Sequence, residues 1–321
     1  MQTPALSKPI PGRLFAHLGA HKTASTMMQR TFWDHRDTFL ESGIYYIPYQ
    51  DFRRQITNKT PQWRRQSPDG NAEMQAAVSD LLPEGGIKAL LVSDEALAGH
   101  IRSDLQNRPH RIYEHCHEVV SLLKHTLGEK QMVIFFMIRS YDEFLESCYL
   151  QLVRAGYSQS FETYIQGFDL AKISWVPTIQ ELAQHLTGDE DLLVVYDYAL
   201  LNQAPGEVLS DLFDRMGVPP PQSIQENGRE RINTSYSEPQ FRKVLLLNRY
   251  WKPSAFKTLR KWVLKAINHR VFRSDSKCRF LSSESRERLA ARYSEDLKII
   301  RQMSNPVELY QSTDSPPHAV E

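Results

Sequence analysis

Short apolar runs recur along this chain, and each is followed by a turn and then by a helical pattern. The longest run, Gln131 to Ile138, is continuous and rich in β-branched and aromatic residues, which is typical of a strand buried on both faces. Similar runs begin at Leu14, Ile87 and Leu192. Repetition of strand, loop and helix predicts an α/β fold with a central parallel sheet flanked by helices, since parallel strands need crossover connections.

The length of the chain, 321 residues, suits one large domain or two. We interpret 1–305 as a single domain that ends in a helical C-terminal part, 240–305. The segment 51–70 is polar, rich in arginine and without apolar periodicity, which favours a loop or lid. Residues 306–321 are polar and contain proline, so we expect a disordered tail.

Composition argues against several classes of protein. The net charge of +1 gives no argument for a nucleic-acid partner. The three cysteines are scattered, which fits a reducing compartment and argues against a disulfide framework or a zinc site. No apolar run approaches the ~18 residues of a membrane span, and the N-terminus lacks the apolar core of a signal peptide. We therefore expect a cytoplasmic protein without a membrane span.

The first predicted strand leads into a segment with the chemistry of an anion-binding loop. Backbone N–H groups at a helix N-terminus lack internal partners and attract negative charge, and a helical pattern begins within this segment. A lysine adds a full charge and three hydroxyls add donors. An ordinary βα turn with a solvated lysine is the alternative. The loop residues are His21, Lys22, Thr23, Ala24, Ser25 and Thr26.

A second motif follows the longest apolar run. Arg139 comes directly after it, and Ser147 lies eight residues further on, in a predicted helix. A guanidinium offers a planar fork of donors suited to phosphate, and serine adds a hydroxyl. This spacing alone is common by chance, but its place after the longest strand and downstream of the Lys22 loop makes it specific.

Together the two motifs resemble those of sulfotransferases that use 3′-phosphoadenosine 5′-phosphosulfate (PAPS). Their phosphate loop is roughly Lys-Thr/Ser-Gly/Ala-Thr/Ser-Thr, preceded in many bacterial members by His. The resemblance covers most of Leu14 to Gly217 in motif order, and the C-terminal third only weakly. It departs at Ala24, where Gly is usual, and alanine is a mild change there only if φ is negative.

The resemblance implies the P-loop-like sulfotransferase fold, PAPS as sulfuryl donor, 3′-phosphoadenosine 5′-phosphate as product, and no metal. Lys22 would be catalytic beside the leaving phosphate, within a loop that binds the 5′-phosphosulfate. Arg139 and Ser147 would bind the 3′-phosphate. Tyr196 would pack on the adenine, unless it is a core tyrosine at a strand end. Arg231, in a late basic loop, would contact the adenosine and its 3′-phosphate.

The base that takes the acceptor's proton is expected after the strand that begins at Ile87. Glu95 is favoured, because bacterial relatives often carry Ser-x-Glu where cytosolic enzymes have a catalytic histidine. Asp94, His100 and Glu41 are the alternatives. A carboxylate at this position can also simply cap the following helix.

The sequence thus predicts a sulfotransferase that moves the sulfuryl group of PAPS to an acceptor hydroxyl. Bacterial-type resemblance favours a carbohydrate or glycolipid as acceptor, with a peptide tyrosine or a small metabolite left open. One alternative is a P-loop kinase of a small molecule, although the Gly-x4-Gly-Lys spacing is missing. Another is a nucleotide-binding relative without catalysis. The sequence points to no particular oligomeric state.

Overall fold

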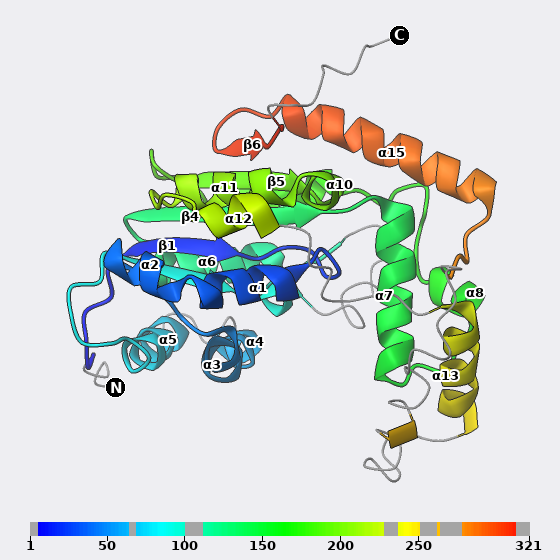
Figure 1. The fold of residues 1–321 in the computed structure, drawn as a ribbon, viewed down its shortest axis with the longest axis horizontal. Coiled ribbons are helices and arrows are strands. Elements are labelled where there is room, and N and C mark those ends of the chain that lie inside the picture. The colour runs from blue at the N-terminus through cyan, green and yellow to red at the C-terminus, as the bar shows by residue number, and fades with distance from the viewer. Residues whose placement is uncertain are drawn as a thin grey trace.

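The structure is a computed structural model that describes residues 6–63, 69–99, 112–227, 237–250, 262–263 and 278–312. A six-stranded sheet lies at its centre, in the order β2-β3-β1-β4-β5-β6, and every strand pair is parallel (Figure 1). The predicted α/β class with a parallel sheet is therefore confirmed. The strands are β1 (Arg13–His17), β2 (Ile44–Tyr46), β3 (Ala89–Ser93), β4 (Gln131–Ile138), β5 (Leu192–Asp197) and β6 (Val307–Leu309).

Helices cover both faces of the sheet. Successive strand residues point to opposite faces, and on each face they form a separate apolar cluster with the helices that cover it. One face packs against α1 (Ser25–Asp34), α2 (Arg36–Glu41), α10 (Tyr198–Gln203), α11 (Pro205–Arg215) and α12 (Gln222–Asn227). The other packs against α5 (Asp69–Ser79), α6 (Cys116–Leu127) and α9 (Val176–Ala183). In β1, Leu14 and Ala16 enter the second cluster and Phe15 enters the first.

The C-terminal helices gather around α7 (Tyr141–Ala155), which follows β4 and projects beyond the sheet (Figure 1). Against it lie α8 (Phe161–Ile165), α13 (Glu238–Tyr250) and α15 (Ser283–Arg301). Asp296 of α15 is buried and accepts hydrogen bonds from the Tyr141 hydroxyl and, at 2.9 Å, from the Trp175 N–H. This bond set fixes α15 to the start of α7. The predicted helical C-terminal part is confirmed within the described residues.

Two parts of the local structure differ from a simple interpretation of the sequence. The helical pattern that begins in the loop segment does not give one continuous helix, because the helix is divided at His35, where φ is −107°. The break lets Phe39 of α2 pack against Phe32 of α1 and, with ring centroids 4.7 Å apart, against Phe213 of α11. The predicted tail over 306–321 begins with a strand, since Val307–Leu309 pairs with β5. Residues 313–321 lie outside the described part.

The predicted loop or lid at 51–70 is helical as far as it is described. It contains α3 (Tyr49–Phe52), a π-helix (Arg53–Thr57) and α4 (Thr60–Trp63). Phe52, Ile56 and Trp63 are buried, so the segment packs onto the domain. The apolar pattern of this segment is not evident in the sequence, because a charged residue, Arg53, also points inward, toward Asp94.

Candidate active site

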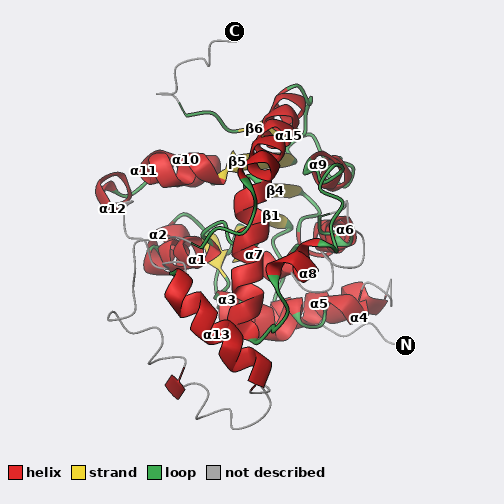
Figure 2. Ribbon diagram, turned by 90° about the vertical axis from the view of Figure 1, so that its right-hand side faces the viewer, coloured by secondary structure: helices red, strands yellow, loops and turns green. Residues whose placement is uncertain are grey.

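The carboxyl ends of the parallel strands place several polar segments at one edge of the sheet. His17 of β1 lies beside Ser93 of β3, and Ile138 of β4 lies beside Asp197 of β5. From β1 the chain continues toward β2, and from β4 it continues toward β5, on opposite sides. Neighbouring strands whose connections diverge form a topological switch point, where open α/β sheets bind ligands. Figure 2 views this edge, with α7 in front of the sheet.

The loop after β1 has the shape of an anion cradle. The N–H of Ala20 donates to the carbonyl of Met137 at 2.8 Å, which carries the pairing with β4 one step past β1. Lys22 and Ala24 then have φ of 67° and 65°, with Thr23 between them in an ordinary conformation. Alternating backbone handedness turns successive N–H groups toward one side and forms an anion-binding concavity. Among the described residues, the N–H groups of 22–26 donate to no carbonyl.

The conformation of Ala24 corrects one expectation. Alanine in place of glycine is a mild change only where φ is negative, but Ala24 is left-handed. The usual glycine of the sulfotransferase loop suits this position because it adopts positive φ without a steric penalty. Alanine at this φ costs ~1–2 kcal/mol.

The three hydroxyls of the loop differ in their surroundings. Thr26 is exposed at the start of α1. Thr23 is fully buried and its hydroxyl donates to the Ala20 carbonyl at 2.5 Å, so the hydrogen of this hydroxyl is already used within the loop, whereas the sequence suggested it as a donor to an anion. The Ser25 hydroxyl is buried and has no partner in the described part of the chain.

The second motif meets the first, as its order in the sequence predicts. The Arg139 guanidinium donates to the Lys22 carbonyl at 2.7 Å, across the switch point between β1 and β4. It also pairs with Glu143 at 3.1 Å and lies over the Tyr198 ring, 4.6 Å from the ring centroid. A guanidinium carries five N–H donors, so these contacts leave capacity for a phosphate.

Lys22 lies in a locally positive environment. Burial lowers the pKa of Lys22, and the like charges of Arg154 and Arg139 lower it further. Ser147 lies on the α7 face that also carries Glu143, one turn earlier, and Arg154, two turns later, because residues four and seven apart share a helix face. This face of α7 and the loop therefore border the same space, and an anion there would stabilise the charged form of Lys22.

Glu95 stands across the same edge, in the turn after β3. Its carboxylate pairs with Arg53 at 3.1 Å and accepts a hydrogen bond from the Gln29 amide at 3.0 Å. Burial, the largest single influence, raises the pKa of Glu95, but the charge of Arg53, hydrogen bonds to the carboxylate and the nearby His21 together outweigh it, and the net pKa is lower than usual. Glu95 is therefore ionised at neutral pH, as a proton acceptor must be, and each carboxylate oxygen retains a lone pair.

The other candidates for the base are placed differently. Asp94 is fully buried, accepts two bonds from Arg53 Nε at 3.1 Å and caps a short 3₁₀ turn through the Ala96 N–H, so its role is structural. Glu41 is exposed and precedes the amino end of β2, at the opposite edge of the sheet. His100 lies outside the described residues.

Tyr196 has the core role, not the adenine contact that the resemblance implies. Its ring has no exposed surface, packs 6.4 Å from Phe135, and its hydroxyl donates to Asp211 of α11 at 2.6 Å. The half-buried aromatic ring at this edge is instead Tyr198, beside Arg139. Arg231 lies outside the described residues.

Several residues at this edge carry no sequence signal. Arg53 and Tyr113 reach it from distant segments, so no local spacing reveals them, and Gln29 lies on α1 directly after the loop without belonging to its motif. His17 has a weak signal, since it ends the strand before the loop. It is fully buried, its Nδ1 lies 2.8 Å from the Ser93 hydroxyl, and burial lowers its pKa to about 4. It therefore remains neutral beneath the loop.

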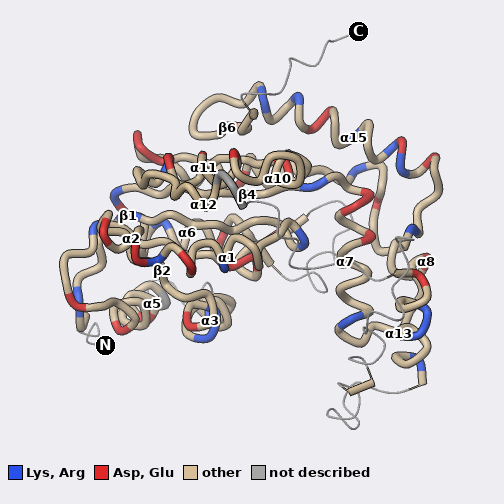
Figure 3. Tube along the Cα trace, in the orientation of Figure 1, with Lys and Arg blue, Asp and Glu red and all other residues tan. Residues whose placement is uncertain are grey.

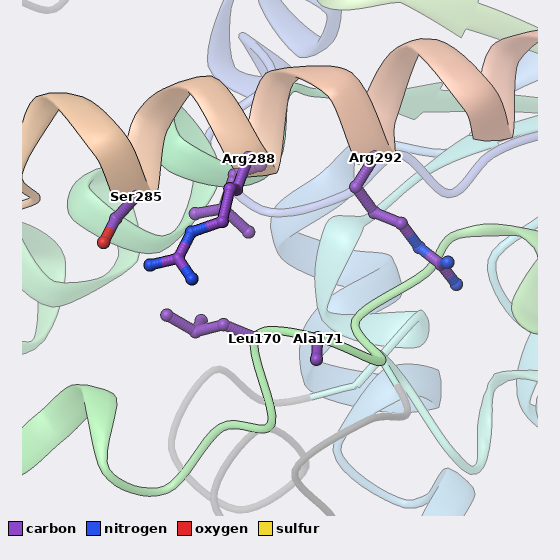
Figure 4. A pocket seen from close by; sticks show the side chains of 6 residues that line it. Leu170, Ala171, Ser285, Arg288 and Arg292 are labelled. Atoms are coloured by element: carbon purple, nitrogen blue, oxygen red, sulfur yellow. The ribbon is translucent and has the colours of Figure 1, made fainter.

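A cavity of about 360 Å³ lies elsewhere, between α15 and the loop that precedes α9 (Figure 4). Its arginines have partners: Arg292 Nε donates to the Ile173 carbonyl at 3.4 Å, and Arg288 lies 3.7 Å from Glu284. No residue of the switch point lines it, so it is not the candidate site. The lining residues are Leu170, Ala171, Ser285, Arg288, Leu289 and Arg292.

The charges at the switch point are local. Basic and acidic positions are interspersed along the rest of the described chain (Figure 3). Within the described ranges, no cluster of three or more His, Cys, Asp or Glu side chains could hold a metal ion. None of the helices described is long and apolar enough to cross a membrane.

Comparison with known proteins adds no family to this geometry. The chain matches no protein-family model and none of the curated proteins with which it was compared. The resemblance to sulfotransferases therefore depends on the two motifs and on the site that they form.

Proposed function

We propose that the protein is a PAPS-dependent sulfotransferase that acts on an acceptor hydroxyl. The observation that carries the proposal is the contact between the two motifs: Arg139 donates to the Lys22 carbonyl at 2.7 Å, at the switch point of the sheet. A ligand with two phosphate groups fits this arrangement, because one anionic group faces the loop and a second is within reach of α7.

The residues present suit PAPS as donor. The N–H groups of 22–26, with Lys22 and the Thr26 hydroxyl, would hold the 5′-phosphosulfate, and His21 would border it. Arg139 and Ser147 would hold the 3′-phosphate. The 3′-phosphate would compete with Glu143 for Arg139, since that ion pair occupies part of the guanidinium.

In the proposed reaction the bond between sulfur and the bridging phosphate oxygen breaks as a bond from the acceptor oxygen to sulfur forms. Lys22 stabilises the negative charge that develops on the leaving phosphate, which is the most direct way to lower the barrier. Glu95 takes the proton of the acceptor hydroxyl. The products are a sulfate ester and 3′-phosphoadenosine 5′-phosphate. Because the sulfuryl group carries less charge than a phosphoryl group, the proposal requires no divalent metal.

Glu95 suits the role of base by position and charge. Gln29 and Arg53 fix its carboxylate from two sides, and its lowered pKa keeps it ionised. The pair with Arg53 reduces its basicity, so the proton transfer is expected late, as the bond to sulfur forms. A carbohydrate or glycolipid hydroxyl is the proposed acceptor, by resemblance to bacterial-type enzymes.

Thermal shift separates this proposal from the kinase alternative. Stabilisation by PAPS and by 3′-phosphoadenosine 5′-phosphate, unchanged by a chelator, is expected of a sulfotransferase. Stabilisation by ATP that disappears with chelator would indicate a kinase. A screen of cell extracts with PAPS, in which mass spectrometry detects products heavier by SO₃, then separates an enzyme from a silent binder and identifies the acceptor.

A further inference from the structure

Tyr113 is held in a strained conformation beside the loop. Its φ of 60° is rare for a bulky residue, and such strain persists only where the surroundings determine the conformation. Its ring is buried between Phe144, 6.4 Å away, and Trp175, 6.3 Å away, and its carbonyl accepts a bond from the Cys116 N–H at 3.0 Å. These contacts fix the direction of its hydroxyl, which points to His21.

The Tyr113 hydroxyl makes two bonds to the same residue. It lies 2.8 Å from the backbone nitrogen of His21 and 2.7 Å from its Nδ1. The backbone N–H can only donate, so the tyrosine oxygen accepts there. Burial raises the pKa of Tyr113 well above its usual value, so the hydroxyl keeps its hydrogen at neutral pH. That single hydrogen is satisfied in this buried place by donation to Nδ1.

A hydrogen bond to Nδ1 determines where the imidazole carries its proton. A neutral histidine has one N–H, and an Nδ1 that accepts leaves the proton on Nε2. The opposite tautomer would direct an Nε2 lone pair at any anion on that side of the ring. His21 immediately precedes Lys22 and lies close enough to Glu95 to influence its carboxylate. Its ring therefore borders the space between the proposed electrostatic catalyst and the proposed base.

We propose that Tyr113 is a positioning residue that fixes His21 as the neutral Nε2–H tautomer, which donates a hydrogen bond to the sulfuryl oxygens during transfer. The identity of the group that His21 contacts rests on the proposed function, whereas the tautomer of His21 does not. A neutral donor adds a hydrogen bond without adding charge beside Lys22 and Arg139. Tyr113 thus acts through His21, and His21 contacts the reacting group.

The tautomer is tested by ¹⁵N nuclear magnetic resonance of the full chain with ring-labelled histidine, with the His21 signals assigned from their loss in His21→Gln. The wild type should show His21 protonated at Nε2, and Tyr113→Phe should show a mixture of tautomers. Tyr164→Phe is the matched control: that tyrosine is also buried, but its hydroxyl has no partner within the described residues. Protonation at Nδ1 in the wild type, or identical spectra in Tyr113→Phe, would overturn the inference.

Kinetics test the donation itself. Tyr113→Phe should lower kcat roughly 10- to 100-fold, with a smaller change in the KM for PAPS. This effect lies between the effect of losing one neutral hydrogen bond and the effect of losing an oriented catalytic donor. Tyr164→Phe should change neither constant. A general loss of folded enzyme would instead reduce the active fraction, which titration with 3′-phosphoadenosine 5′-phosphate measures.

A double-mutant cycle distinguishes this role from a structural one. His21→Gln places an amide donor near the Nε2 position, and an amide has no tautomer to fix. In that background Tyr113→Phe should change kcat by no more than about twofold. Fully additive effects would refute the assigned role. If no acceptor is sulfated, the proposed function fails, while the resonance experiment still decides the tautomer.

Discussion

Replacing Ala24 by glycine should stabilise the protein, although this change usually has the opposite effect. Ala24 has φ 65° and ψ 26°, where an L-residue with a Cβ costs ~1–2 kcal/mol and glycine costs nothing. Glycine also increases the conformational entropy of the unfolded chain, which offsets ~0.4–1 kcal/mol. The balance predicts a gain in the free energy of unfolding of about 0–1.6 kcal/mol, centred near 0.8 kcal/mol.

Urea denaturation measures this gain as a shift of the unfolding midpoint, provided that the slope of the free energy of unfolding against urea concentration is the same in both proteins. The matched control is Ala291→Gly, because Ala291 is exposed in the middle of α15 and glycine in a helix interior costs roughly 0.5–1 kcal/mol. The two variants should therefore shift the midpoint in opposite directions. If Ala24→Gly destabilises the protein as much as the control does, the loop does not have the left-handed conformation on which the anion cradle depends.

Three further substitutions test the site. Lys22→Ala should lower turnover by about two orders of magnitude or more and cofactor affinity by less, and near-normal turnover would refute its assigned role. Glu95→Gln should lower turnover roughly 10²–10⁴-fold and abolish the acidic limb of the pH–rate profile. In the wild type that limb should lie below the usual carboxyl pKa of ~4.3, because Arg53 stabilises the ionised form of Glu95. A retained limb would assign the base elsewhere. Arg53→Ala leaves Asp94 buried without its cation and should cost about 3 kcal/mol of stability in urea denaturation. This is the lower end of the range for a buried pair, because the Arg53 side chain is 34% exposed. A loss below about 1 kcal/mol would contradict the pairing.

The sheet was predictable where the strands are long and apolar. The apolar run from Gln131 to Ile138 predicted β4 with its correct bounds. It also predicted that Arg139 lies at the carboxyl edge of the sheet, because Arg139 directly follows the end of the strand. β6 has only three residues, and its burial comes from pairing with β5, which no local pattern reveals. The helical segment Tyr49–Trp63 was missed because Arg53, a charged residue, points inward.

The site was predictable as a set of motifs but not as a geometry. Lys22 and Arg139 are recognisable from their neighbours in sequence, and parallel topology brings them together. The left-handed φ of Ala24 was not predictable from the residue type, because alanine disfavours that conformation. Which way Tyr196 faces follows from the alternation of β5 against α11. Tyr113 lies far from the loop in the sequence, so only the fold shows that it contacts His21.

The central claim is that a PAPS-type nucleotide binds at the switch point with its 3′-phosphate on Arg139. Calorimetry should show that 3′-phosphoadenosine 5′-phosphate binds far more tightly than adenosine 5′-phosphate. In Arg139→Ala this preference should shrink by ~1.5–3 kcal/mol, the range for hydrogen bonds to charged groups, while Arg288→Ala, at the separate cavity, should leave it unchanged. An equal affinity for the two nucleotides in the wild type, or a full preference in Arg139→Ala, would contradict the account.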